Sequence, residues 1–121
     1  MLILKPFQLV RQRDSMECGV ACLSMVCKYY GVKVSLNSIR KICQSSIDGV
    51  SMKGIVDAAH ALGFQSYGAK IQISALYAAK KTVVLHWNQN HFVVLYKVDC
   101  KGRFFWIADP GKGKYKHKVF F

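Results

Sequence analysis

The chain has 121 residues, 52% hydrophobic and 20% charged, which is the composition of one globular domain and not of a disordered segment. Its 18 Lys and Arg against 6 Asp and Glu give a net charge of +12, which would attract an anionic partner or surface, the alternative being a solvated surface with a basic tail. No apolar run approaches the roughly 20 residues of a membrane span, and the apolar start Met1–Leu4 is too short for a secretion signal, so we expect a domain on the cytoplasmic side.

The first predicted element is a strongly apolar helix that ends at Gly31, a typical residue just past a helix end. Asp14 or Ser15 is expected to cap its start, with Glu17 three residues after Asp14 as in a capping box. Because so little of this helix is polar, it should lie in the middle of the domain.

Two shorter helices are predicted next. Ser35 is expected to cap a helix that runs through Cys43, and Ser51 a helix over Met52–Leu62 that ends at Gly63.

From residue 64 onward the pattern is that of strands. We expect strands at 64–71, 82–87, 91–98 and 103–108, with a helical turn at 74–80. Lysines alternate through the last ten residues, which suggests a further strand or an extended exit. The predicted class is α+β, with N-terminal helices packed on a C-terminal antiparallel β-sheet in a single domain over residues 1–121.

The cysteines argue for reduced thiols. The chain has five, an odd number, and no secretion signal: Cys18, Cys22, Cys27, Cys43 and Cys100. Their spacing contains no Cys-x-x-Cys pair, so we expect no metal site. Cys22, Cys27 and Cys43 lie at apolar positions and should be small buried hydrophobes. The basic charge comes without any helix-turn-helix, zinc-finger or RNA-binding signature, so we expect no nucleic-acid partner either.

Four residues together have the layout of a cysteine protease. Cys18 stands near the start of the first helix, where a thiol pKa is lowered, and His91 could accept its proton. Asp109 could orient the imidazole. The side-chain amide of Gln12 and the backbone N–H of Cys18 could both donate hydrogen bonds to an oxyanion.

This chemistry requires a particular strand register. We expect His91 to stand directly opposite Asp109, on the same face of a hairpin with an odd-length connection or a bulge near Gly102. A register shifted by one residue would place Asp109 on the other face. His86, on the neighbouring strand, is the competing candidate for the base.

Two stretches resemble one known family. The first joins Gln12 to Glu17-Cys18-Gly19-x-Ala21-Cys22-Leu23-x-Met25 and Tyr29-Tyr30-Gly31, and the second joins His91-Phe92-Val93-Val94-Leu95 to Asp109-Pro110. They resemble the cysteine and histidine motifs of the double-glycine leader peptidases, papain-like domains at the N-terminus of bacteriocin-processing ABC transporters. Asp48-Gly49-Val50-Ser51 and Ala58-Ala59-x-x-Leu62-Gly63-Phe64 also fit, so the similarity spans residues 8 to 115.

The resemblance implies a papain-like cysteine endopeptidase that removes a leader after a Gly-Gly pair, coupled to export of the mature peptide. It implies that Cys18 is the nucleophile, His91 the base, Asp109 the orienting acid and Gln12 the oxyanion donor. No cofactor is expected in this domain, and ATP only for the transporter part, whose membrane and nucleotide-binding domains are absent from this chain.

The partners implied are a precursor peptide with a Gly-Gly leader and the membrane domain of an ABC transporter. An anionic inner-membrane surface is a further candidate, and the implied location is the cytoplasmic side of the bacterial inner membrane. Two alternatives remain: a domain that docks a leader without cutting it, and another papain-like thiol acyl-transfer enzyme such as an amidase or transglutaminase.

Overall fold

The structure, a computed structural model, describes residues 6–14, 16–43, 49–76, 82–87, 91–99, 101 and 104–118. Within these ranges the order of elements is α1 (Cys18–Tyr29), α2 (Leu36–Ile42), α3 (Met52–Ala61), the 3-10 turn η1 (Ile73–Ala75), β1 (Val83–Trp87), β2 (His91–Asp99), β3 (Phe104–Asp109) and β4 (Gly113–Lys118). Helices precede an antiparallel sheet, so the predicted α+β class is confirmed. No described helix is long and apolar enough to cross a bilayer.

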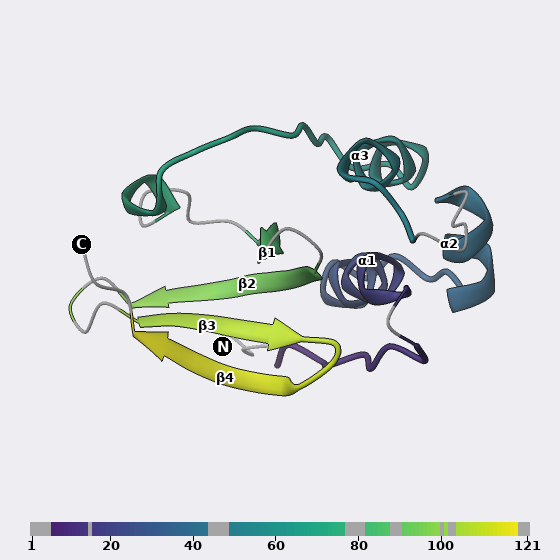
Figure 1. The fold of residues 1–121 in the computed structure, drawn as a ribbon. Coiled ribbons are helices and arrows are strands. Elements are labelled where there is room, and N and C mark those ends of the chain that lie inside the picture. Colours follow the sequence, from purple (N-terminus) through teal and green to yellow (C-terminus); the bar gives the residue numbers. More distant parts are fainter. Residues whose placement is uncertain are drawn as a thin grey trace, which may run out of the picture.

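The strands form one sheet in the order β1-β2-β3-β4, in which each strand pairs with the next along the chain. The lysine-rich end is β4, which pairs with β3 in register from Phe104 opposite Lys118 to Asp109 opposite Gly113. Figure 1 shows the three described helices gathered toward one end of this sheet, with α1 next to β2.

The strand predicted at 64–71 is wrong. These residues run extended across the top of the molecule in Figure 1 from α3 toward η1, and they pair with no described strand. Ser66 instead bonds back to α3, since its hydroxyl donates to the Val56 carbonyl at 3.2 Å and its own carbonyl lies 2.6 Å from His60 Nε2. Of the turn predicted at 74–80, η1 covers the first part, and residues 77–80 lie outside the described residues.

The start of α1 differs from the prediction. The helix begins at Cys18, with Glu17 as its N-cap residue and no side-chain cap. Asp14 accepts a hydrogen bond from the backbone of Met16 at 2.8 Å, so its carboxylate closes a turn before the helix and does not form a capping box. Ser15 lies outside the described residues. The end is as predicted, because Gly31 follows the C-cap residue with a positive φ of 76°.

The caps of the two shorter helices are confirmed. The Ser35 hydroxyl accepts a hydrogen bond from the N–H of Ser38 at 3.1 Å, and the Ser51 hydroxyl accepts one from the N–H of Gly54 at 3.0 Å. Each serine thereby satisfies one of the amide groups that a helix start leaves unpaired.

The core forms on both sides of α1. One cluster packs α1 against the sheet and contains Cys18, Cys22, Met25, Phe92, Val94 and Ala108. A second cluster packs α1 against α2 and α3 through Val20, Leu23, Cys27, Ile39 and Ala58. A third lies on the opposite face of the sheet, because Val93 and Leu95 alternate with Phe92 and Val94 along β2. The apolar helix therefore occupies the centre of the domain, as predicted.

Val50 connects the first two clusters and is held between two glycines. A Cβ atom added at Gly19 of α1 would lie 2.3 Å from Val50 Cγ1, and one added at Gly54 of α3 would lie 2.8 Å from Val50 Cγ2. The two methyl groups of Val50 thus occupy the space that a side chain at either glycine would need. Gly19 therefore allows the first turn of α1 to approach the segment that leads into α3.

We expect Gly19→Ala to lower the free energy of unfolding by about 1–3 kcal/mol, because the added methyl would lie 2.3 Å from Val50 Cγ1 and overpack the site. Urea unfolding followed by circular dichroism measures this change. Gly68→Ala is the matched control, since its Cβ would meet its nearest neighbour at 3.6 Å and should cause no loss. Equal stability of both variants would show that Val50 can move after all.

Candidate active site

His91 and Asp109 are joined by a hydrogen bond between two adjacent strands. His91 opens β2 and Asp109 closes β3, and the distance from His91 Nε2 to Asp109 Oδ1 is 2.7 Å. The His91 side chain is 28% exposed and that of Asp109 only 2%. The imidazole is thus open to a reactant while the carboxylate behind it is enclosed.

The strand register differs in detail from the prediction. Val94 stands opposite Ala108, and continuing this count places Asp109 opposite Val93, so His91 is two residues away from direct opposition. A shift of two keeps both side chains on one face, and the hydrogen bond runs diagonally between the strands. The irregularity that adjusts the register lies between Leu95 and Lys97, not near Gly102, which is outside the described residues.

Asp109 is held by the turn that joins β3 to β4. Its Oδ1 also accepts the N–H of Gly111 at 2.8 Å, and its carbonyl accepts the N–H of Lys112 at 3.1 Å. Asp followed by Pro and Gly is a typical sequence for such a turn. A buried carboxylate requires hydrogen-bond donors, and this turn supplies one while the imidazole supplies the other.

Cys18, the first residue of α1, packs against the end of the sheet that carries this pair. It shares a core cluster with Phe92, the neighbour of His91, and with Ala108, the neighbour of Asp109. Its backbone N–H belongs to the first turn, whose amide groups have no acceptor within the helix. The packing of α1 on the sheet therefore brings a thiol, an amide donor and the His91–Asp109 pair into one neighbourhood.

Gln12 reaches the same place from the segment before α1. Its backbone N–H donates to the carbonyl of Pro110 at 3.0 Å. Its side chain lies near the turn, since a Cβ atom added at Gly111 would be 3.5 Å from Gln12 Oε1 and 3.4 Å from Asp109 Oδ1. That Oε1 atom is buried and has no hydrogen-bond partner among the described residues. All four predicted site residues are therefore gathered at one end of the sheet.

His86 is placed less favourably than His91. It lies on β1, exposed, with its ring stacked on that of Phe92 at a centroid distance of 4.7 Å. No carboxylate pairs with it in the part of the chain that the structure describes. Because His91 is bonded to an orienting acid, it is the better candidate for the base.

The other described cysteines are buried thiols, as predicted. Burial raises the pKa of Cys22 well above its ordinary value, and the nearby Cys18 and Asp109 raise it further. Burial also raises the pKa of Cys27, and that of Cys43 to about 11. These groups stay protonated near neutral pH and contribute packing. Cys100 lies outside the described residues, which contain no cluster able to hold a metal ion.

Two contributors were not singled out from the sequence. The amide of Gly111 orients Asp109, and the Asp-Pro-Gly turn was a signal that could have indicated it. Arg40 of α2 forms an ion pair with Glu17, the residue before Cys18, and no sequence pattern links these two distant positions.

Sequence comparison identifies relatives that are much longer than this chain. The probable microcin-H47 secretion/processing ATP-binding protein MchF of Escherichia coli is 34% identical over 105 residues, which are 87% of this chain and 15% of the relative. The lactococcin-G-processing and transport ATP-binding protein LagD of Lactococcus lactis subsp. lactis is 32% identical over 119 residues, 93% of this chain and 16% of the relative. The chain thus spans about 15% of the length of these relatives.

Structure comparison identifies peptidase domains. A double glycine motif protease from an AMS/PCAT transporter, solved in complex with the leader peptide, superposes with a TM-score of 0.85 at 34% identity, covering 92% of this chain and 79% of that one. The peptidase domain of Streptococcus ComA, a bi-functional ABC transporter of a quorum sensing pathway, gives 0.82 at 26% identity, covering 93% and 87%. These matches confirm the predicted papain-like fold.

The model of one protein family covers nearly the whole chain. Residues 6–119 match the Peptidase C39 family, a range that includes α1, the full sheet and all four predicted site residues. The fold, the sequence relatives and this match agree, and the chain belongs to the peptidase C39 family.

Proposed function

We propose that this chain is a cysteine endopeptidase that removes the leader of a bacteriocin-like precursor peptide after a Gly-Gly pair. The observation that carries the proposal is the hydrogen bond of His91 to Asp109, formed beside the helix start that bears Cys18. Membership of the peptidase C39 family supports it. The relative solved with a leader peptide supports the choice of substrate.

The proposed mechanism uses each ring nitrogen of His91 for one task. Nε2 is engaged by Asp109, which leaves Nδ1 to take the proton of the Cys18 thiol. The thiolate then attacks the scissile carbonyl carbon, and the imidazolium returns the proton to the leaving amine. Water then attacks the resulting thioester with His91 as the base, and the Cys18 thiol leaves as the thioester bond breaks.

Two donors would stabilise the tetrahedral oxyanion. The N–H of Cys18 points from the unpaired first turn of α1, and the side-chain amide of Gln12 comes from the preceding segment. Loss of one such donor typically costs about 2.7–4 kcal/mol of transition-state stabilisation. A Gly-Gly pair suits a narrow cleft, because residues without a Cβ pass where bulkier ones would clash.

The proposed partners follow from the longer relatives. They are transport and processing proteins with ATP-binding parts, so we infer that this domain acts with the membrane domain of an ABC transporter. Its place would then be the cytoplasmic side of the bacterial inner membrane. ATP would be used by the transporter part, and the peptidase chemistry described above needs no cofactor.

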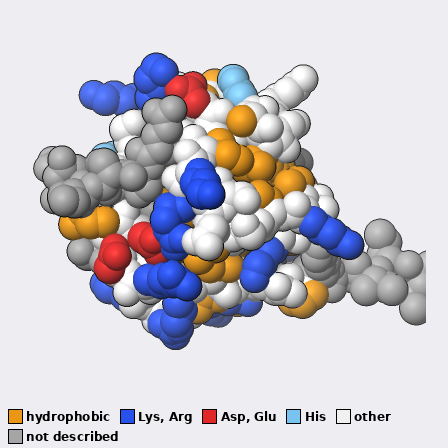
Figure 2. Space-filling view, turned by 90° about the vertical axis from the view of Figure 1, so that its right-hand side faces the viewer, with side chains coloured by type: hydrophobic (Ala, Val, Ile, Leu, Met, Phe, Trp, Pro, Cys, Tyr) orange, Lys and Arg blue, Asp and Glu red, His pale blue; other side chains and the backbone are white. Residues whose placement is uncertain are grey.

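The distribution of charge on the surface supports an anionic membrane surface as a further partner. Figure 2 shows Lys and Arg side chains spread widely over one face, with few acidic ones among them. On β4 and the turn before it we define a lysine row: Lys112, Lys114, Lys116 and Lys118. Lys116 lies 5.0 Å from the ring centres of both Phe104 and Trp106, a mixture of cations and aromatic rings that suits an interface with anionic lipid headgroups.

We expect Cys18→Ala to abolish cleavage of a synthetic precursor peptide with a Gly-Gly junction, because no other described thiol can replace the nucleophile. Mass spectrometry under reducing conditions locates the cut, which should follow the second glycine. A peptide with Leu-Leu at the junction is the control for specificity. Leader binding without a cut by the unaltered chain would favour a docking domain. A deamidated or cross-linked peptide would favour another acyl-transfer enzyme.

We expect His91→Ala to reduce kcat by about 10²–10⁴-fold, the usual contribution of a general base. His86→Ala is the matched control on the adjacent strand and should keep kcat within about threefold, since it removes only a stacked ring. Steady-state cleavage of the same peptide measures both values. A larger loss of kcat in His86→Ala than in His91→Ala would mean that His86 on β1 is the base.

We expect the triple variant Lys112→Gln, Lys116→Gln and Lys118→Gln to bind vesicles that contain phosphatidylserine about 100-fold less tightly, at roughly 1 kcal/mol per lysine. Lys114 is left in place because its Nζ donates to the Phe7 carbonyl at 2.8 Å. The control triple of exposed lysines, Lys33→Gln, Lys41→Gln and Lys70→Gln, removes the same charge elsewhere. Equal losses in vesicle sedimentation would mean that only net charge matters.

A further inference from the structure

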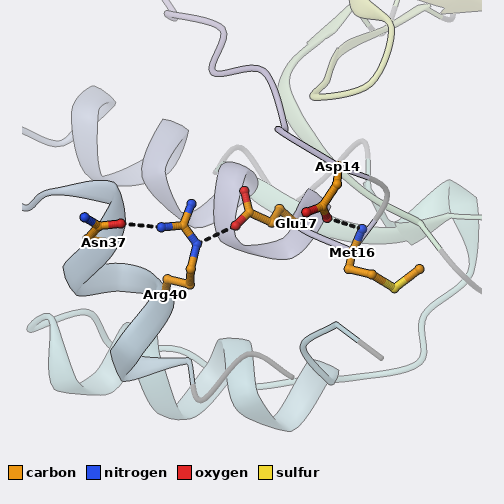
Figure 3. A network of polar contacts seen from close by, with 5 residues as sticks. All are labelled: Asp14, Met16, Glu17, Asn37 and Arg40. Atoms are coloured by element: carbon orange, nitrogen blue, oxygen red, sulfur yellow. Dashed lines mark hydrogen bonds and ion pairs between the residues drawn. The ribbon is translucent and has the colours of Figure 1, made fainter. Parts of the chain in front are cut away.

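The residue before the nucleophile carries a charge that the mechanism above does not use. Glu17 is the N-cap residue of α1, yet its side chain does not cap the helix. Its carboxylate instead forms an ion pair with Nε of Arg40 on α2, and Figure 3 shows the two side chains reaching toward each other between the helices. The Glu17 side chain is 13% exposed, so this is a largely enclosed charge next to Cys18.

Arg40 is itself held in place. Its Nη1 donates to Oδ1 of Asn37, one turn earlier on α2, while Nε donates to Glu17. The remaining nitrogen, Nη2, is buried and has no partner among the described residues. A planar guanidinium makes both bonds in a fixed orientation, whereas the three donors of an ammonium group rotate freely and fix no such orientation. The first turn of α1 is therefore attached to α2 by a pair with defined geometry.

The charges around Cys18 make the pair important for its thiol. A bare carboxylate beside a thiol opposes formation of the thiolate, and a cation at the same place offsets it. The charged groups around the Glu17–Arg40 pair are Arg13 and Asp14, from the segment before α1. On the sheet side, Cys18 and Asp109 both act on the Cys22 thiol, and Asp109 is bonded to His91. α3 contributes the apolar Ile55 here, while its ion pair between Lys53 and Asp57 is exposed.

We propose that Arg40 is a positioning residue of this peptidase, which fixes the first turn of α1 through Glu17 and cancels the negative charge next to the Cys18 thiol. The inference rests on the proposed function of Cys18 as nucleophile. Glu17 in return favours the helix start, because a carboxylate there interacts well with the helix dipole. The pair keeps this benefit without opposing the thiolate.

The rate of alkylation of Cys18 by iodoacetamide, followed by mass spectrometry from pH 5 to 10, tests the proposal without any peptide substrate. The chain is used whole, and its fold is checked by circular dichroism. In Arg40→Gln the midpoint of the pH profile should rise by about one pH unit, because Glu17 is left bare. In Glu17→Gln it should fall, because the Arg40 cation is left unpaired, and in the double variant it should return close to the unaltered value.

A merely structural role would not give shifts of opposite sign. If both single variants move the midpoint in the same direction, or neither moves it, the proposal is overturned. Arg40→Lys keeps the charge but loses the bond to Asn37, so its midpoint should stay near the unaltered value while kcat for the peptide falls. Arg40→Lys decides the question if Arg40→Gln does not fold. A raised midpoint in Arg40→Lys would overturn the electrostatic role, because the charge is still present.

The two proposals fail separately. If the unaltered chain does not cut the Gly-Gly peptide but the midpoints still move apart, the proposed function falls and the role of Arg40 stands. If the peptide is cut and the midpoints do not move, the proposed function stands and the role of Arg40 falls.

Discussion

The burial of α1 is the constraint on which the rest of the structure depends. Nine of its 12 residues are buried, so it must be enclosed on two sides, by the sheet and by α2 with α3. Gly19 and Val50 show how closely the enclosure fits. Because the helix cannot shift in its packing, its first residue, Cys18, has a fixed place at the edge of the sheet, set by the core and not by a loop.

A second constraint is the buried charge of Asp109. A carboxylate that is almost completely enclosed costs free energy unless donors surround it, and here the Gly111 amide and the His91 ring both bond to the same oxygen. The turn after β3 thus stabilises the charge and at the same time orients the ring. The backbone bond from Gln12 to Pro110 attaches the segment before α1 to this same turn. The elements that stabilise the fold are therefore the ones that assemble the site.

Position in the fold distinguishes the thiol of Cys18 from the other described thiols. The buried Cys22, Cys27 and Cys43 all have raised pKa values, and they lie one or more turns inside the helices or at the end of α2. Cys18 differs from them in position, because it is the first residue of its helix and packs against the end of the sheet that carries His91 and Asp109. The Arg40 guanidinium also lowers the pKa of the Glu17 carboxyl, so the pair stays ionised at neutral pH and the region near the thiol carries little net charge from it.

Local chemistry is what the sequence by itself determined: the serine caps of α2 and α3, the glycine after α1, the order of helices before strands, and the four residue types that a thiol peptidase needs. Propensity and side-chain pattern suffice for these because each depends on near neighbours. Only the tertiary structure decided that residues 64–71 pair with no described strand, that His91 meets Asp109 diagonally, and that Glu17 bonds to Arg40 instead of forming a capping box with Asp14. Each of these features depends on residues far away in the chain. Tertiary packing decides which residues come within reach of one another, and therefore whether a segment pairs as a strand, which register two strands adopt and which ion pair forms.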